Sequence, residues 1–267
     1  MTHIVKVKKD FDMQKKISCF LLGTVVAAFF VTLWTGNLIK LGNENRKQEK
    51  IDLSSGYREQ NIGEEMCAFL QGKEKVGKYV ATYLFETDYG YNEWKHTFSE
   101  EQMKQLQKSQ KEQSGWNTYM ELTKSIWDEV KYFPVTEFTN NQNLKVTYVN
   151  SWMAERNYNG KGVHEGTDVI ATKNERGLYP IISMTDGTVT KKGWLEKGGY
   201  RIGITTDSGA YFYYAHLESY ANFEVGDKVK AGDVLGFMGD SGYGPEGTVG
   251  KFVVHLHLGI YIYPNGE

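Results

Sequence analysis

Residues 251–263 read Lys-Phe-Val-Val-His-Leu-His-Leu-Gly-Ile-Tyr-Ile-Tyr, a run rich in β-branched and aromatic side chains. Such a run predicts a β-strand. Side chains two positions apart on a strand point to the same face, so His255 and His257 are expected to project together while Leu256 turns to the opposite face. The sequence therefore predicts two imidazoles side by side on one face of a sheet.

Four shorter runs predict further strands, separated by turns that contain Gly, Asp and Ser. They are residues 144–149, 187–191, 200–205 and 210–214. Short strands at this spacing are typical of an antiparallel sandwich or barrel. The predicted fold class is α+β: a C-terminal, mainly antiparallel β-sandwich or barrel-like domain, preceded by a transmembrane helix and a small helical region.

The C-terminal part of the chain holds four of its six histidines. With one aspartate they form three clusters: His164 with Asp168, a lone His216, and the pair His255 and His257. A catalytic zinc site needs about three nitrogen or oxygen ligands and an open position for water, and hydrolysis also needs groups that move protons. These five side chains could supply the whole set.

Each cluster also has a simpler explanation, since a single histidine is more often a surface or satisfied core residue than a ligand. Gly166 favours the metal site, because glycine permits a tight bend that lets His164 and Asp168 converge. Two imidazoles and one carboxylate, closed by water, are a ligand set of a tetrahedral catalytic zinc site. The three clusters together favour that interpretation over the simpler one.

Four segments resemble the lysostaphin-type (LytM-like) zinc metalloendopeptidases. They are His-Glu-Gly-Thr-Asp (164–168), Tyr-Tyr-Ala-His-Leu (213–217), Val-Gly-Asp-Lys-Val-Lys-Ala-Gly-Asp-Val-Leu-Gly (225–236) and His-Leu-His (255–257). The segments stand in the family's order, and the resemblance covers roughly residues 150–267. It is specific because it includes every metal and catalytic position of the family.

The resemblance implies that His164, Asp168 and His257 bind one zinc ion per chain. His216 and His255 would be the two histidines that do not bind the metal. One of them would take a proton from the attacking water and return it to the leaving amine, and the other would help to stabilise the tetrahedral intermediate. The implied substrate is bacterial cell-wall peptidoglycan, cut in a stem peptide or a cross-bridge.

Two features near these motifs remain open. Members of the family often carry a tyrosine upstream of the first ligand; Tyr158 is the nearest candidate, and a packing role for it is equally open. Residues 239–254 form a longer, glycine-rich stretch where the family commonly has a compact Ser-Thr-Gly-Pro segment. We expect this stretch to rim the substrate groove. Glu165 and Glu246 are expected to be exposed carboxylates, with substrate recognition as the alternative.

Residues 17–35 carry no charge, which predicts a membrane-spanning helix. At about 1.5 Å per residue the run reaches roughly 28 Å, close to the ~30 Å hydrocarbon core of a bilayer. A group of lysines precedes it: Lys6, Lys8, Lys9, Lys15 and Lys16. These lysines predict a single-pass protein of the cell membrane with a cytoplasmic N-terminus and an extracytoplasmic catalytic domain. A cleaved signal peptide is the alternative, but no clear small-x-small site follows the apolar run.

The predicted organisation has five parts. They are cytoplasmic residues 1–16, a signal anchor at 17–36, a polar linker at 37–56, a helical subdomain at 57–140 and the lysostaphin-type peptidase domain at 141–267.

Residues 57–133 repeat apolar side chains at helical spacing. Ser99 and Gln102 predict a capping box at the start of one helix, and Pro134 is expected to end the last one. The region holds no catalytic constellation. A spacer, a docking site for a regulatory protein partner and control of access to the active site all stay open.

Charge and cysteine content limit the binding partners and the disulfide bonds that we expect. A net charge of −2 and a pI near 6.3 give no reason to expect nucleic acid. The only cysteines are Cys19 and Cys67. They cannot easily pair within one chain, so no disulfide framework is expected, and Cys67 is expected to be a small buried residue.

Two other classes of function compete with a zinc peptidase. The first is a catalytically inactive relative, a scaffold or regulator of cell-wall remodelling, division or sporulation; such proteins usually lose a ligand or a catalytic histidine, and this chain keeps all of them. The second is a carrier module, because residues 225–232 resemble a lipoyl or biotinyl hairpin. The attachment lysine in a turn such as Met-Lys-Met is absent. Zinc content separates the enzyme from the carrier, and turnover separates it from the scaffold.

Overall fold

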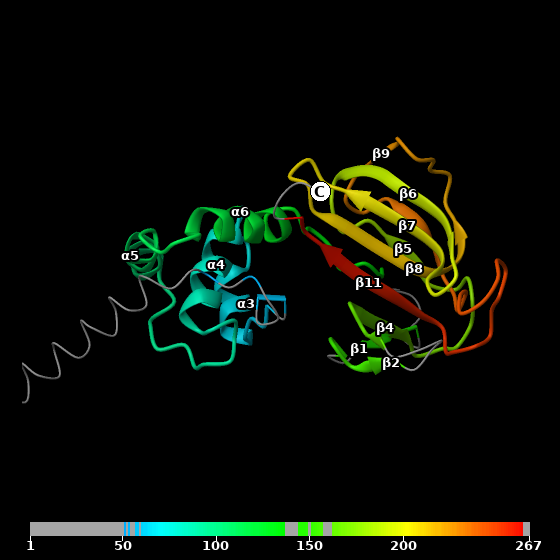
Figure 1. Ribbon diagram of the computed structural model, residues 1–267, viewed down its shortest axis with the longest axis horizontal. Helices are drawn as coiled ribbons and strands as arrows, with labels where there is room; N and C mark the ends of the chain where they lie inside the picture. Colours follow the sequence, from blue (N-terminus) through cyan, green and yellow to red (C-terminus); the bar gives the residue numbers. More distant parts are fainter. Residues whose placement is uncertain are drawn as a thin grey trace, which may run out of the picture. The chain divides into compact units, whose positions relative to one another are not determined.

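The computed structural model describes residues 51, 53, 57, 58, 60–136, 144–148, 151–156 and 162–263 (Figure 1). The chain divides into two compact units, Met1–Ile51 with Gln110–Gly115, and Asp52–Ser109 with Trp116–Glu267. In the first unit, the Ile51 N–H donates to the Ser114 carbonyl at 3.1 Å. All the strands and nearly all the helical residues belong to the second unit.

Helices occur where the helical spacing predicts them. They are α3 (Glu64–Leu70), α4 (Gly77–Glu86), α5 (Glu100–Gln110) and α6 (Trp116–Trp127). Their buried core includes Met66, Tyr79, Val80, Tyr83, Leu84 and Met103. Half of the predicted capping box is confirmed: the Gln102 N–H donates to Ser99 Oγ at 3.2 Å, which satisfies one of the free donors of the first turn of α5. The Ser99 N–H donates to the Thr97 carbonyl at 3.0 Å.

The prediction that Pro134 ends the last helix is wrong, because α6 already ends at Trp127. The chain leaves the helix early and joins the sheet. The Lys131 N–H donates to the Met184 carbonyl at 2.8 Å, and the Pro134 carbonyl accepts from the Ile182 N–H at 2.9 Å. These backbone hydrogen bonds to residues 182 and 184 replace helical ones in the segment around the proline.

The prediction that Cys67 is buried is also wrong, because this residue is exposed. Helix α3 is short, and Met66 is its one buried residue. Successive residues of a helix point about 100° apart, so the position next to a buried methionine turns toward solvent.

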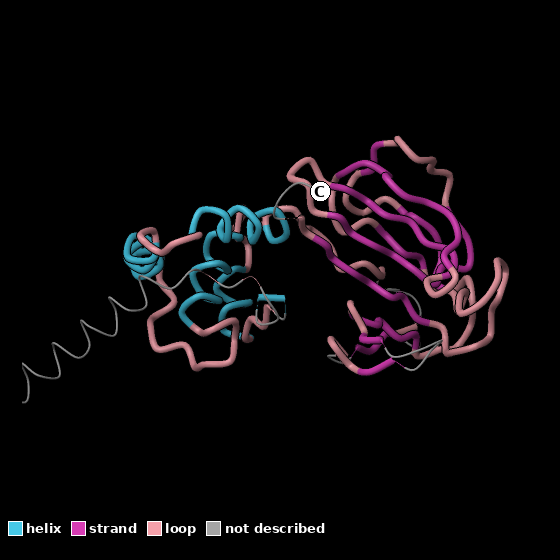
Figure 2. Tube along the Cα trace, viewed as in Figure 1, coloured by secondary structure: helices cyan, strands magenta, loops and turns pink. Residues whose placement is uncertain are grey.

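A mostly antiparallel sheet forms the C-terminal part, as predicted (Figure 2). Its hydrogen-bonded order is β1-β4-β11-β8-β7-β6-β9, with β10 pairing β8 and β5 pairing β10. The strands of this sheet are β1 (Val146–Tyr148), β4 (Thr167–Ala171), β5 (Pro180–Ile182), β6 (Gly187–Leu195), β7 (Gly199–Thr205), β8 (Tyr211–Tyr220), β9 (Lys228–Val229), β10 (Val234–Met238) and β11 (His255–Tyr261). A separate hairpin pairs β2 (Glu155–Arg156) with β3 (Gly162–Val163).

The two faces of the central strands differ. One face is apolar and fully buried, and includes Val189, Ile202, Ile204, Phe212, Tyr214 and Leu256. The alternate positions carry glycines, tyrosines and the histidines of β11. The predicted strand at 251–263 is observed as His255–Tyr261, with Leu256 on the buried face and both histidines on the other.

Within the described part of the chain, no helix is long and apolar enough to cross a membrane. The predicted anchor at residues 17–36 lies outside the described residues, and so do residues 1–16, which are predicted to be cytoplasmic, and Tyr158.

Candidate metal centre and substrate groove

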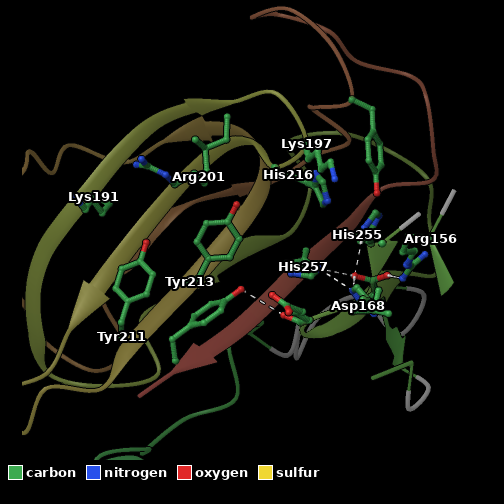
Figure 3. A pocket seen from close by; sticks show the side chains of 18 of the residues that line it. Arg156, Asp168, Lys191, Lys197, Arg201, Tyr211, Tyr213, His216, His255 and His257 are labelled. Atoms are coloured by element: carbon green, nitrogen blue, oxygen red, sulfur yellow. Dashed lines mark hydrogen bonds and ion pairs between the residues drawn. The ribbon is translucent and has the colours of Figure 1, made fainter. Parts of the chain in front are cut away.

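Three predicted side chains meet at the junction of β4 and β11 (Figure 3). His257 on β11 lies directly opposite Asp168 on β4, and such antiparallel partners place their side chains on the same face. His164 lies just after β3. Three atoms form a ligand triangle: His164 Nε2, Asp168 Oδ1 and His257 Nδ1, separated by 2.9 to 3.1 Å.

Hydrogen bonds behind the ligand triangle orient two of its members. His164 Nδ1 lies 3.1 Å from the Ser151 carbonyl and 2.9 Å from Ser151 Oγ. Because a carbonyl only accepts, Nδ1 carries the proton and Nε2 turns its lone pair into the triangle. Arg156 Nη2 donates to Asp168 Oδ2 at 2.7 Å, which leaves Oδ1 for the triangle. Motif spacing carries no signal for Ser151 or Arg156, because only the folded β2–β3 hairpin and the turn before it bring them to the site.

The donor set fits a zinc ion. Two ring nitrogens and a carboxylate oxygen point toward one another, and such lone pairs repel unless a proton or a cation lies among them. Atoms at this separation can all bind one ion at the ~2.0–2.2 Å typical of zinc. Burial disfavours the charged form of Asp168, but the surrounding rings of His164, His257 and His255 outweigh burial and hold the pKa of the carboxyl well below its usual range.

His216 and His255 form a second group, the histidine pair, with ring centroids 4.7 Å apart. Each is held through Nδ1 by a backbone carbonyl, Ser241 at 2.7 Å for His216 and Val253 at 2.8 Å for His255. Nδ1 is therefore the protonated nitrogen in both neutral rings, and Nε2 is an acceptor. His255 Nε2 lies 3.6 Å from Asp168 Oδ1.

Burial keeps the histidine pair neutral. The exposed fractions are 6% for His216 and 8% for His255. Burial lowers the pKa of His216 to about 3 and also lowers the pKa of His255, because desolvation disfavours the imidazolium. Both rings can thus accept a proton at neutral pH.

The backbone of His216 explains how its ring reaches the site. His216 has φ of 62°, a left-handed conformation that is uncommon in a strand. The pairing of β7 with β8 shifts register here, and the His216 N–H donates to the Gly198 carbonyl at 2.8 Å. A bulge of this kind re-aims one side chain and is frequent next to active sites. The sequence predicted a strand only to residue 214 and gave no sign of the bulge.

The glycine-rich stretch at 239–254 connects β10 to β11 and supplies Tyr243 and Phe252 to the groove, in agreement with the predicted rim. The Phe252 ring lies 4.6 Å from the His216 ring and 5.0 Å from the His255 ring. These aromatic contacts help to desolvate the histidine pair. The two glutamates predicted to be exposed, Glu165 and Glu246, are exposed.

A groove of about 880 Å³ runs across the site. In Figure 3 it extends from Arg156, past Asp168 and His257, to Tyr213 and Arg201. All five predicted site residues line it. The arrangement can therefore hold a metal ion and two proton acceptors beside an extended ligand.

Two family models match the chain. The model of peptidase family M23 matches residues 162–267, which include the ligand triangle and the histidine pair. The model of the LytM N-terminal domain matches residues 42–129, which include all four described helices.

Individual relatives agree with these matches. An L-Ala–D-Glu endopeptidase of Bacillus subtilis is 45% identical over 116 residues, 43% of this chain and 34% of the relative. The glycyl-glycine endopeptidase ALE-1 of Staphylococcus capitis is 34% identical over 99 residues, 36% of this chain and 24% of the relative. The chain thus spans about a third or less of the length of these curated relatives.

A crystal structure of a candidate glycyl-glycine endopeptidase lytM from Ruminococcus gnavus covers 84% of this chain and 90% of its own chain, with 49% identity and a TM-score of 0.75. This match extends over both the helical region and the sheet. The chain is therefore a member of peptidase family M23, of the LytM type.

Proposed function

We propose that this chain is a zinc-dependent endopeptidase that hydrolyses peptide bonds of bacterial cell-wall peptidoglycan with metal-activated water. One observation carries the proposal. The ligand triangle and the two Nε2 acceptor atoms of the histidine pair occur together in one groove. The names of the curated relatives, which cut L-Ala–D-Glu or glycyl-glycine bonds, support a peptide substrate of the wall.

His164, Asp168 and His257 would hold the ion. When bound, zinc supplies Lewis-acid chemistry that lowers the pKa of water and polarises the scissile carbonyl. Arg156 keeps the second oxygen of Asp168 occupied, so that Oδ1 faces the ion. Ser151 keeps His164 in the tautomer that presents Nε2.

We assign the proton transfer to His255. Its neutral Nε2 can accept the proton of the attacking water, and the imidazolium that forms would lie 3.6 Å from Asp168 Oδ1, which stabilises its charge. The same nitrogen can then donate that proton to the leaving amine. His216 is the second candidate. Stabilisation of an oxyanion by His216 would require a proton on Nε2, which its burial disfavours.

We also propose that residues 17–36 anchor the chain in the cell membrane with the groove on the extracytoplasmic side. An uncharged run preceded by lysines supports this topology, and so does a substrate that lies outside the membrane. The check is N-terminal sequencing of the membrane-bound protein together with protease protection of the catalytic domain. A mature protein that begins after residue 36 would replace the anchor with a signal peptide.

Digestion of purified peptidoglycan by residues 37–267 tests the enzymatic proposal. The released muropeptides are analysed by mass spectrometry, with and without a zinc chelator. We expect new N-termini that the chelator abolishes. A folded, zinc-loaded protein that releases nothing from several wall types would instead favour a scaffold or regulator without catalysis.

A further inference from the structure

One end of the groove is built from tyrosines. Lys191 on β6, Gly203 on β7, Tyr213 on β8 and Gly259 on β11 are cross-strand partners in turn, so they share one face of the sheet. His257 lies two residues before Gly259 on β11, so this face also carries a member of the ligand triangle. The row therefore connects the candidate metal centre to the far end of the groove.

Three tyrosine rings cover this face. Tyr211, Tyr213 and Tyr261 lie with ring centroids 6.0 to 6.3 Å apart, and the Tyr213 ring is 5.9 Å from the His257 ring. Glycines make room for them, since a Cβ on Gly203 would collide with the Tyr211 ring and one on Gly198 with the Tyr213 hydroxyl. The glycines and tyrosines thus form a shaped floor rather than a packed core.

The charged groups at this end of the groove are the cations Arg201 and Lys191 and the carboxylate of Glu165, whose backbone carbonyl accepts from the Tyr261 hydroxyl. Among the described residues, no carboxylate lies within 4.0 Å of a side-chain nitrogen of Arg201, Lys191 or Lys197, all of which line the groove. Arg201 Nη1 is buried without a hydrogen-bond acceptor in the same described residues. The Tyr211 and Tyr213 hydroxyls also make no hydrogen bond to any described residue.

A cation with an unused buried N–H is costly to leave unpaired, and an anion is the ligand that satisfies it. Arginine in particular matches the two oxygens of a carboxylate, and tyrosine hydroxyls can donate to the same group. The flat tyrosine faces suit the apolar stems of amino acid side chains. A peptide that carries an acidic group can make both contacts, with its carboxylate on the arginine and its apolar stems on the tyrosine rings.

We propose that the Arg201 end of the groove binds a free carboxylate of the peptide substrate, so that the chain selects acidic stem peptides over neutral glycine bridges. This inference rests on the proposed endopeptidase function. The ring-to-ring steps from His257 through Tyr213 to Tyr211 are about 6 Å each, so the carboxylate would lie within a few residues of the scissile bond. Arg201 acts here as a specificity residue and does not touch the reacting atoms.

Paired peptides that differ by one charge test this subsite. In the first pair, a stem peptide with a free D-Glu α-carboxylate is compared with its D-isoglutamine amide; in the second, a free C-terminal carboxylate is compared with a C-terminal amide. The full-length, zinc-loaded chain is assayed in mild detergent. We expect kcat/KM to be about tenfold or more higher for the acid of at least one pair, mainly through KM. The pair that discriminates identifies which carboxylate binds.

Three variants locate the effect. Arg201→Gln should bring the acid-to-amide ratio close to one, and Lys191→Gln should lower it partly. Arg201→Lys should restore part of the ratio. Lys228→Gln is the matched control: it removes an exposed cation of β9 that lies outside the groove, and it should leave the ratio unchanged. Zinc content and thermal melting verify that each variant is folded.

Peptides that the chain does not cleave are titrated into it by calorimetry instead. An Arg201-dependent preference for the acid in binding, without cleavage, would support the subsite and contradict the endopeptidase proposal. Cleavage of acid and amide at equal rates in both pairs would support the endopeptidase and overturn the subsite. An acid that neither binds nor reacts better than its amide, or a preference that survives Arg201→Gln, also overturns the subsite.

Discussion

Side chains help to hold the ligand triangle, whereas the histidine pair is held by backbone carbonyls alone. Arg156 of the β2–β3 hairpin donates to Asp168 at 2.7 Å. Ser151, which lies before that hairpin, holds His164 through its hydroxyl at 2.9 Å and its carbonyl at 3.1 Å. Side-chain partners of this kind orient metal ligands and tune their charge. This half of the site is suited to holding a cation.

Among the described residues, backbone carbonyls are the only hydrogen-bond partners of Nδ1 in the histidine pair. The carbonyl of Ser241 holds His216 and that of Val253 holds His255, which fixes the tautomer without adding a charge. The Phe252 ring of the 239–254 stretch packs against both histidines and reduces their exposure to solvent. We infer that the ligand triangle binds the metal and the histidine pair moves protons. Substitutions should therefore be able to remove proton transfer without removing zinc binding.

The largest effect is expected for Asp168→Ala. It removes one member of the ligand triangle and leaves Arg156 without its partner, so both zinc binding and cleavage should be lost. Metal content by mass spectrometry and peptidoglycan turnover measure the two losses. A variant that still holds one zinc ion per chain would contradict the ligand assignment.

His255→Ala should separate chemistry from metal binding. Because general acid–base catalysis contributes ~10²–10⁴-fold, we expect a drop of at least that size in cleavage, with zinc still bound at one ion per chain. The same two assays apply. If zinc is lost together with activity, then His255 is a ligand and the division of the site into two halves fails.

Arg156→Gln sharpens the comparison, because it changes only the support of a ligand. Loss of such a partner costs ~10–100-fold in metal affinity. We expect a zinc dissociation constant raised by that factor, measured by competition with a chelator, and cleavage that recovers in excess zinc. Lys228→Gln serves as the control, since it removes a cation far from the triangle in the sheet order. Equal zinc affinity for Arg156→Gln and wild type would show that Arg156 does not support Asp168 as a ligand.

How much of this site follows from the sequence differs between its halves. The pattern of motifs predicts that His164 and His257 belong to one site. They do come together, although 93 positions separate them in the chain, because β4 and β11 are neighbours in the sheet. The family order carried that information. The left-handed backbone of His216 could not be predicted, because it depends on a register shift between β7 and β8.

Supporting residues were missed for the same reason. Arg156 has no motif, and its role depends on where the β2–β3 hairpin folds against β4. The tyrosine floor is likewise invisible in a chain with 18 tyrosines, because Tyr211, Tyr213 and Tyr261 become neighbours only through the pairing of β8 with β11. Helical spacing, in contrast, is local, so it predicted α3 to α6 while missing the early end of α6.

The smallest expected effect is a dependence of stability on pH. Burial lowers the pKa of His216 to about 3 from the ordinary value of 6.5. Between these pH values His216 is protonated in the unfolded chain but neutral in the folded chain. The free energy of unfolding therefore falls as pH drops below 6.5 and does not change with this group above that pH. In the zinc-free chain, wild type should lose roughly 1–2 kcal/mol relative to His216→Gln between pH 7 and 5. Urea unfolding at each pH measures the difference, and equal losses would show that His216 is not desolvated.

Titration of zinc into the zinc-free chain, with release of peptide amines from peptidoglycan as the readout, tests the central claim most directly. We predict no release without metal, a rise in rate that is linear in added zinc, and a plateau at one ion per chain. His255→Ala should bind the same single ion and release nothing. Amine release that does not depend on zinc, or a saturated wild-type chain that releases no amines, would contradict it.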